Sequence, residues 1–520
     1  MQLLIHWRGS SSLPQPSIML LFEFLEDVQP LEYYNYLSVV FAFIASLASD
    51  SKHIYSAVSL GLLLYCYVKS TTLYILAHWR VWILFISVLL SLILGNSMIL
   101  DILVLIAAVL TLIILILFPI FDKKKLTGEY AVGTYSFNID IKLPPNTQLY
   151  NETQTYALPC QCWYPIRKTK HNWFGTSSSI LWTSADKTQQ LLEAKLLLDH
   201  LAFDIKVPKI ITQHLMLSGT NSKWHSSPAN IIDLGIDKKL PIAIYSHGLT
   251  SFRQMHTSCI EQLASHGFVV FSVDHIPSAN CARPYKCLHK SQNFDYRIPG
   301  SSPDERVFFQ GGVDRRSKEI LLLIDHLATL SQELPIDMSQ IHLFGHSFGA
   351  VTQATVASRV ATIKSAVLLD SWMFPMPDAD RKRGASASIL TISSDIWSVA
   401  PYQAAFRRDF LHNTSKEFTR CRYYLTGTDH QNFCDTWMLA NKWMLRRPAV
   451  LGPANRKLTT SALDTMTLEF FLYNMTRKDV PFTEYLENRI TDSQLRNYIK
   501  NNLKIEDESR SNDKYLKMYN

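Results

Sequence analysis

The first 120 residues carry a different pattern of apolar and polar positions from the rest of the chain. Between Tyr36 and Phe121, apolar runs alternate with short polar breaks. The runs cover residues 36–48, 54–68, 81–94 and 98–121. Only the last reaches the roughly 20 residues that span a membrane by length alone, and flanking Tyr, Trp and Ser residues would have to complete the shorter three. The pattern predicts about four transmembrane helices in residues 36–121.

Ionisable residues in this region support the membrane prediction. They are almost confined to the breaks between runs, with one exception at Asp101. Those in the breaks are Asp50, Lys52, Lys69 and Arg80. A helical bundle in a soluble domain would instead carry a polar face on each helix. The composition therefore predicts an integral, multi-pass membrane protein.

The orientation depends on few charges. Three lysines at residues 123–125 follow the last apolar run. With four spans, the positive-inside rule places the amino terminus and everything after residue 125 on the cytosolic side. An odd number of spans would move the later residues to the other side. Residues 1–35 are predicted to be an amphipathic segment and not a signal peptide.

Residues 126–490 show alternating strand and helix patterns. Strand-like apolar runs occur at residues 240–245, 268–273, 341–344, 365–369, 388–393 and 421–425. Helical patterns lie between several of them, for example at residues 254–266 and 317–334. Such alternation predicts an α/β fold with a mainly parallel sheet and helices on both faces, preceded by an all-α transmembrane region. Residues 491–520 are rich in Asn, Lys, Glu and Ser, which predicts a disordered tail.

Charge and cysteine usage exclude some function classes. The net charge of +7 is modest for 520 residues, and no basic stripe with interleaved aromatics predicts a nucleic-acid partner. Basic pairs such as Arg315-Arg316 are expected on solvated faces. The pair Cys160-x-Cys162 has no second pair or histidine set that would complete a zinc site. No metal is therefore predicted.

The pentapeptide Gly-His-Ser-Phe-Gly at residues 345–349 is the strongest chemical motif. It follows the strand-like run 341–344 and precedes a helix-compatible stretch at 351–360, which is the strand, sharp turn and helix of a nucleophile elbow. The glycines flank the serine because a side chain at either position would collide with the crossing strand and helix. Ser347 is the candidate nucleophile.

A serine nucleophile needs a base and an acid, which lie downstream of the serine in this fold. Asp370 directly follows the strand-like run 365–369, and His430 lies just beyond the run 421–425. These are the candidate acid and base. Asp395, which follows the run 388–393, remains an alternative acid. Asp429 adjoins the histidine, but the side chains of neighbouring residues in an extended loop point apart.

Two backbone N–H groups are candidates for the oxyanion hole. One belongs to Phe348, the residue after the serine. The other belongs to Leu249, which follows Ser246-His247-Gly248 at the end of an earlier strand-like run. Gly248 allows a turn tight enough to aim the Leu249 N–H at the site.

Several sequence blocks together identify a family resemblance. They are Ser-His-Gly-Leu at 246–249 with Phe252-Arg253, Leu-Ala-Ser-His-Gly-Phe at 263–268, Gly-His-Ser-Phe-Gly at 345–349, Leu-Asp-Ser-Trp-Met-Phe-Pro at 369–375 and His-Gln-Asn-Phe at 430–433. In type and order they resemble the plasma-type (isoform II) platelet-activating-factor acetylhydrolases over roughly residues 128–484. The resemblance maps Ser347, Asp370 and His430 onto the triad and favours Asp370 over Asp395. It also maps the N–H groups of Leu249 and Phe348 onto the oxyanion hole.

The resemblance implies an α/β-hydrolase catalytic domain at residues 126–490. The implied activity is calcium-independent hydrolysis of the short or oxidised sn-2 acyl ester of a phospholipid, through an acyl-serine at Ser347. No metal or organic cofactor is needed for this chemistry. The apolar region departs from the secreted members, which begin with a removable signal peptide. Two alternatives are a different carboxylester or lactone hydrolase on the same fold, and a non-enzymatic membrane scaffold.

Overall fold

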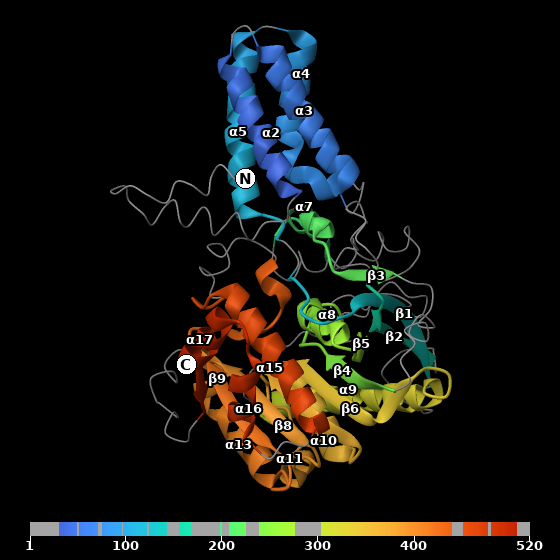
Figure 1. Cartoon of the computed structure of the whole chain (residues 1–520). Helices are drawn as coiled ribbons and strands as arrows, with labels where there is room; N and C mark the ends of the chain where they lie inside the picture. Colours follow the sequence, from blue (N-terminus) through green and yellow to red (C-terminus); the bar gives the residue numbers. More distant parts are fainter. Residues whose placement is uncertain are drawn as a thin grey trace. The chain divides into compact units, whose positions relative to one another are not determined.

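A computed structural model gives the structure of the chain (Figure 1). It describes residues 31–48, 51–70, 75–95, 97–121, 124–142, 155–168, 198–199, 207–224, 239–275, 303–438, 451–476 and 480–506. The chain divides into two compact units, Met1–Lys123 and Lys124–Asn520. Nearly all of the predicted amphipathic segment at residues 1–35 lies outside the described residues.

Each of the four apolar runs forms a helix in the N-terminal unit. The helices are α2 (Glu32–Leu47), α3 (Lys52–Lys69), α4 (Trp82–Leu94), which follows the 3-10 turn η2 (Ile75–Val81), and α5 (Met98–Leu117). Neighbours along the chain pack against each other, and α5 closes the bundle by packing on α2 (Figure 1). Two helical stretches, Ala77–Leu94 and Met98–Leu117, are long and apolar enough to cross a membrane. Core helices of soluble proteins and signal sequences meet the same criteria. Two of the about four predicted spans therefore have the length and hydropathy of a transmembrane helix.

The bundle is apolar outside and partly polar inside. Its buried positions include small and hydroxyl side chains, for example Ser38, Ala42, Ser59, Ala107 and Thr111. Most of the large apolar side chains exposed among the described residues project from α2, α3, α4 and α5. Arg80 and Glu32 form an ion pair in which both side chains are 2% exposed. The interior also holds a hydrophobic cluster that includes Leu63, Leu84 and Val88, so the bundle differs from a soluble one in the many large apolar side chains that it exposes.

A ten-stranded sheet organises the C-terminal unit, with strand order β10-β9-β8-β7-β6-β4-β5-β2-β1-β3. The strands are β1 (Ala131–Lys142), β2 (Thr155–Ile166), β3 (Ser222–Trp224), β4 (Leu240–Ser246), β5 (Val269–Val273), β6 (Ile336–His346), β7 (Ile363–Leu369), β8 (Ser388–Ser394), β9 (Arg420–Leu425) and β10 (Leu503–Ile505). Strands β4 to β9 are all parallel to their neighbours in that group. Antiparallel pairing occurs where β2 joins β1 and β5 and where β10 joins β9.

Helices cover both faces of this sheet. The longer ones are α9 (Pro303–Leu330), α10 (Phe348–Arg359), α13 (Pro401–Asn413), α15 (Arg456–Thr476) and α17 (Ser493–Asn502). The shorter ones are α7 (Lys209–Thr212), η3 (Gln213–Leu217), α8 (Thr257–Ser265), α11 (Asp378–Arg383), α12 (Asp395–Val399), η5 (His430–Phe433), η6 (Asp435–Met438) and α16 (Phe482–Arg489). One hydrophobic core contains α9, α10 and part of α13, and the other contains α8, α15, α16 and α17.

Alternation along the strands explains the two cores. In β4, Ile242 and Ile244 belong to the first core, whereas Ala243 and Tyr245 belong to the second. Successive strand residues point to opposite faces, so a continuous apolar run is what a sheet covered on both sides requires. The prediction of a mainly parallel α/β fold with helices on both faces is confirmed.

The prediction of a disordered tail from residue 491 is wrong for its described part. Tyr498 and Ile499 of α17 are buried in the second core, and β10 extends the sheet beside β9. Glu506 forms a buried ion pair with Arg407 at 2.5 Å. Within this polar composition, Tyr498 and Ile499, together with the partly buried Leu495, pack α17 onto the second core. Residues 507–520 lie outside the described part of the chain.

Candidate active site

Ser347 lies at the sharp turn between β6 and α10, and its backbone adopts φ 57° and ψ −118°. This positive φ is strained for a residue with a side chain. A Cβ added at Gly349 would lie 2.0 Å from the backbone oxygen of Ser246, and one at Gly345 would lie 2.6 Å from the Gly349 carbonyl. Both contacts are impossible. The strand and helix cross here so closely that only glycine fits two residues before and two residues after the serine.

The structure brings the three predicted triad residues together. The Oγ of Ser347 lies 2.9 Å from Nε2 of His430, and Nδ1 of His430 lies 2.6 Å from Oδ2 of Asp370. The other carboxylate oxygen of Asp370 accepts a hydrogen bond of 2.6 Å from the backbone N–H of Ser394. Asp370 is fully buried, while the His430 side chain is 20% exposed. This hydrogen-bonded order is the geometry by which a carboxylate orients an imidazole toward a serine.

Asp395 and Asp429 have different contacts. The carboxylate of Asp395 accepts a hydrogen bond from the backbone N–H of Gly427 at 3.0 Å, and its own N–H donates to Thr428. Asp429 caps η5 by accepting from the backbone N–H of His430 at 2.6 Å. Both carboxylates therefore fasten the loop that carries the histidine, whereas Asp370 is the one bonded to its ring.

The His430 ring is held between two other rings. Trp397 of α12 stacks on it with centroids 4.1 Å apart and an interplanar angle of 13°. His346 lies at 4.5 Å, and its Nε2 donates to the backbone carbonyl of His430 at 3.1 Å. Burial, followed by the neighbouring His430, holds the pKa of His346 well below its usual range, so His346 adds no charge beside the ring. Trp397 was not predicted, because nothing in its local sequence distinguishes it from a packing aromatic.

The two predicted oxyanion-hole residues lie next to the nucleophile. Phe348 is the first residue of α10, and an N–H at that position has no partner within its helix. Leu249 follows β4 in a turn that runs against the elbow: a Cβ on Gly248 would lie 3.5 Å from Cβ of Ser347 and from Nδ1 of His346. Phe348 thus adjoins Ser347 in sequence, and Gly248, the residue before Leu249, lies against Ser347.

Aromatic side chains pack beside the nucleophile and the acid. The ring centroids of Phe309 and Trp372 are 4.8 Å apart, and those of Phe348 and Trp372 are 5.6 Å apart. Phe309 comes from α9, whereas the other two residues follow Ser347 and Asp370 closely in sequence. Such apolar neighbours lower the local dielectric constant and strengthen hydrogen bonds within the site.

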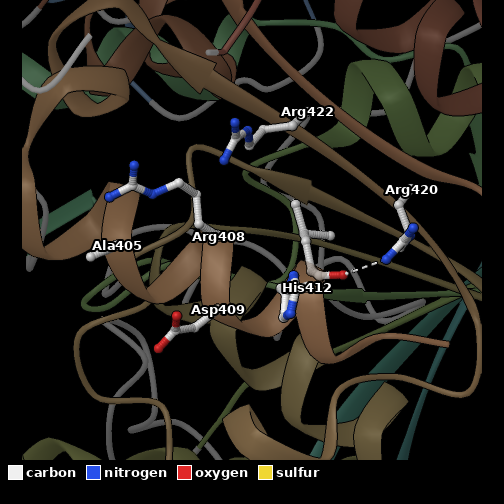
Figure 2. A pocket seen from close by; sticks show the side chains of 7 residues that line it. Ala405, Arg408, Asp409, His412, Arg420 and Arg422 are labelled. Atoms are coloured by element: carbon white, nitrogen blue, oxygen red, sulfur yellow. Dashed lines mark hydrogen bonds between the residues drawn. The ribbon is translucent and has the colours of Figure 1, made fainter. Parts of the chain in front are cut away.

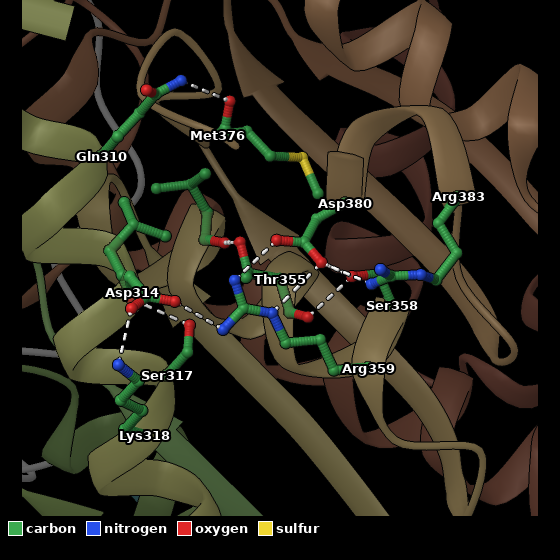
Figure 3. A network of polar contacts seen from close by, with 12 residues as sticks. Gln310, Asp314, Ser317, Lys318, Thr355, Ser358, Arg359, Met376, Asp380 and Arg383 are labelled. Carbon is green, nitrogen blue, oxygen red and sulfur yellow. Dashed lines mark hydrogen bonds and ion pairs between the residues drawn. The ribbon is translucent and has the colours of Figure 1, made fainter. Parts of the chain in front are cut away.

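An ion-pair network anchors the far end of the helix that follows Ser347 (Figure 3). Arg359, the last residue of α10, pairs with Asp314 of α9 at 2.8 Å and with Asp380 of α11 at 2.6 Å. Asp380 also pairs with Arg383 at 2.5 Å. Because these pairs join α9, α10 and α11, they fix the position of α10, which begins at the strained turn of Ser347.

A pocket of about 620 Å³ lies between α13 and β9. Figure 2 shows its basic lining, in which Arg420 donates to the backbone carbonyl of Leu411 at 3.2 Å. It is lined by Ala405, Arg408, Asp409, Leu411, His412, Arg420 and Arg422. None of the predicted site residues is among them. The bond from Arg420 satisfies a carbonyl near the C-terminal end of α13, which is a structural use of that guanidinium.

Comparisons with known proteins agree with this geometry. A family model described as "Platelet-activating factor acetylhydrolase, isoform II" matches residues 124–320 and 315–485. A "Platelet-activating factor acetylhydrolase" from Canis lupus familiaris is 26% identical over 242 residues, which are 42% of this chain and 51% of the relative. One from Bos taurus is 27% identical over 339 residues, 61% of this chain and 68% of the relative. The chain thus spans about half the length of the first of these relatives.

A ferulic acid esterase from Streptomyces cinnamoneus has a similar structure. Its TM-score is 0.50 at 17% sequence identity, and the match covers 72% of this chain and 97% of the esterase. At this identity the likeness concerns the fold alone.

Histidines buried in the C-terminal unit, which carries the candidate triad and is named the catalytic unit, predict that acid destabilises the fold. Burial lowers the pKa of His256 and of His342 to about 3 and holds that of His247 and His346 well below the usual range. In the unfolded chain the pKa of a histidine is about 6.5. Below that pH the unfolded state binds more protons, so the free energy of unfolding should fall by about 1.4 kcal/mol per pH unit for each histidine until its folded pKa is reached.

His342→Gln isolates one of these groups, because His342 lies away from the triad and bonds to Ser365 at 2.8 Å. We expect the free energy of unfolding, measured with urea on the full chain in detergent, to fall less steeply in this variant between pH 6.5 and 5. The difference in slope should correspond to about one bound proton. An identical slope in the wild type and the variant would contradict the assignment of a neutral, buried His342.

Proposed function

This chain belongs to the platelet-activating-factor acetylhydrolase isoform II family of serine carboxylic ester hydrolases, and we propose that it hydrolyses the sn-2 acyl ester of phospholipids. The proposed substrates carry short or oxidised acyl chains. The observation that carries the proposal is the continuous hydrogen-bonded series from Ser347 through His430 to the buried Asp370. A non-enzymatic scaffold would have no need to keep these three groups aligned in a strained elbow.

The proposed reaction proceeds through an acyl-serine. Nε2 of His430, 2.9 Å from the Ser347 hydroxyl, accepts its proton as the oxygen attacks the ester carbonyl. The N–H groups of Leu249 and Phe348 stabilise the oxyanion of the tetrahedral intermediate. His430 then donates the proton to the oxygen of the departing lysophospholipid. A water molecule activated by the same imidazole hydrolyses the acyl-enzyme, so the cycle returns every proton without a cofactor.

Surrounding groups support the charge changes in this cycle. Asp370 accepts from Nδ1–H of His430, which fixes the tautomer whose Nε2 faces the serine. The backbone N–H of Ser394 holds the carboxylate in place. The face of Trp397 lies parallel to the imidazole at 4.1 Å, where a ring stabilises a neighbouring cation. Trp397 therefore favours the imidazolium form that exists during acylation.

The surroundings of the site are apolar. Phe309, Phe348 and Trp372 pack against one another in the hydrophobic core, and Phe348 directly follows Ser347 in sequence. The triad itself defines acyl transfer, whereas the acyl length and the leaving group depend on the shape of the pocket. A different carboxylester or lactone hydrolase is therefore the second candidate, and a substrate profile separates the two.

We further propose that the N-terminal unit holds the enzyme in a membrane as a multi-pass anchor. Its outward-facing large apolar side chains, and the small and hydroxyl side chains among its buried positions, match helices packed in lipid. Lys52 pairs with Asp101, and Arg80 pairs with Glu32, so these charges are neutralised within the unit. Two spans or four spans both return the chain to its starting side, and the lysines at 123–125 favour the cytosol for the catalytic unit.

The acid assignment predicts an unequal effect of two substitutions. Asp370→Asn should lower kcat by about 10⁴-fold, because the amide cannot hold the imidazole in the reactive tautomer. Asp395→Asn, the matched control, removes a loop hydrogen bond and should lower kcat by about tenfold or less. Steady-state hydrolysis of an aryl acetate by both purified variants measures the ranking. The reverse ranking would transfer the acid role to Asp395.

The substrate assignment predicts a specific profile for the purified full chain. It should hydrolyse 2-acetyl and short oxidised 2-acyl phospholipids faster than 2-palmitoyl or 2-oleoyl phospholipids, and chelators should not reduce the rate. Ser347→Ala should lose nearly all turnover, about 10⁶-fold, and retain the circular dichroism spectrum of the wild type. Equal rates on long-acyl phospholipids, or a marked preference for lactones or simple aryl esters, would favour the second candidate.

The membrane assignment predicts that the full chain stays in the membrane pellet after extraction with alkaline carbonate. In sealed microsomes, protease should remove a C-terminal epitope tag without detergent, since the catalytic unit faces the cytosol. Release into the carbonate supernatant would contradict the anchor. Protection of the tag would place the catalytic unit on the lumenal side.

A further inference from the structure

Arg316 is a fully buried arginine on α9 that the triad mechanism does not use. The sequence predicts a solvated face for Arg315-Arg316, and for Arg316 this is wrong. Its guanidinium donates to the backbone carbonyl of His247 at 2.6 Å and to that of Gly248 at 3.2 Å. A buried charge requires such partners, and these two carbonyls belong to the loop that carries Leu249.

The orientation of one peptide group connects Arg316 to the reaction. The carbonyl of Gly248 and the N–H of Leu249 belong to the same peptide unit. In a planar trans peptide these two groups point in opposite directions. Holding the Gly248 carbonyl toward Arg316 therefore holds the Leu249 N–H on the opposite side of the peptide, away from Arg316. The same turn packs against Ser347 and His346.

His247 supplies a second hold on the same carbonyl. Its Nδ1–H donates to Gly248 at 2.7 Å, while its Nε2 accepts from the backbone N–H of His275 at 3.0 Å. Both nitrogens are thus committed, and the ring is neutral, since burial keeps its pKa well below the usual range. The ring of His275 in turn bridges Ser246 and Glu319 of α9 at 2.8 and 2.7 Å. The loop after β4 is therefore tied to α9 through several buried bonds.

Arg316 also contacts the other half of the oxyanion hole. Its guanidinium lies over the Phe348 ring, 4.7 Å from the centroid. Phe348 follows the nucleophile and carries the second proposed N–H donor. One buried side chain therefore touches both segments whose N–H groups must converge on a single oxygen.

We propose that Arg316 is a positioning residue that orients the oxyanion hole by holding the Gly248–Leu249 peptide with its N–H toward the reacting carbonyl. The inference rests on the proposed serine-esterase function and deepens it. Without Arg316, the Gly248 carbonyl keeps only the bond from His247, so the peptide rotates more readily and a carbonyl oxygen can replace the donor. Removal of one oxyanion-hole donor costs about 10²–10³-fold in kcat, so loss of its positioning should cost about 10–100-fold.

A pair of matched esters tests this role. In the thiono ester the carbonyl oxygen is replaced by sulfur, which accepts hydrogen bonds poorly and gains less from the hole. Each variant is assayed as the full chain in detergent, on an aryl acetate and its thiono analogue. Active sites are counted with an organophosphonate. Arg316→Met should lower kcat per active site for the oxygen ester about 10–100-fold with KM nearly unchanged, and the preference for oxygen over sulfur should shrink in proportion.

Two further variants make the result decisive. Arg316→Lys keeps the charge on a single donor nitrogen and should restore only part of the preference, since an ammonium cannot reach both carbonyls in the fork geometry of a guanidinium. Lys318→Met removes one positive charge from an exposed position of the same helix and should leave the preference unchanged. If Arg316→Met yields no active sites, Arg316→Lys decides alone.

Equal losses on both esters, or an unaltered preference in Arg316→Lys and Arg316→Met, would overturn the positioning role and leave the esterase proposal intact. A wild-type chain that neither hydrolyses the aryl acetate nor reacts with the phosphonate would instead contradict the proposed function itself.

Discussion

Parallel pairing of β6, β7, β8 and β9 is the constraint on which the candidate site depends. It brings the carboxyl ends of these strands to one edge of the sheet. His346 pairs with Leu369, which pairs with Ile392, so Ser347 and Asp370 leave adjacent strands side by side. The N–H of Ser347 donates to the Leu369 carbonyl, and that of Asp370 donates to the Ile392 carbonyl. A shift of one residue would turn every side chain to the opposite face and separate the two groups.

The parts of the site that could be predicted are those encoded over short stretches. The elbow needs only a strand, two glycines around Ser347 and a helix, all within about twenty residues. The same reasoning put Asp370 first as the acid but left Asp395 as an alternative, because both follow strand-like runs. What separates them is long-range: Asp370 reaches the His430 ring, while Asp395 bonds to Gly427. The family resemblance favoured Asp370, whose carboxylate is bonded to the His430 ring.

Other features depend on contacts that no local pattern reveals. The long β1–β2 pair and its attachment to β5 were not predicted, since antiparallel register across a sheet depends on partners far apart in sequence. The sequence alone does not distinguish Trp397 from an ordinary packing residue, because its stacking on His430 is a long-range contact. Arg316 reads as a surface charge until the loop after β4 offers it two carbonyls. The helix α17 was missed because average composition outweighed its two buried residues.

The central claim is that Ser347 is the nucleophile at a site built by this convergence. The most direct test is to label the wild-type full chain with an organophosphonate, digest it and locate the adduct by mass spectrometry. We predict a single adduct on Ser347, lost when the protein is unfolded before labelling. An adduct on another residue, or equal labelling of the folded and unfolded chain, would contradict the account.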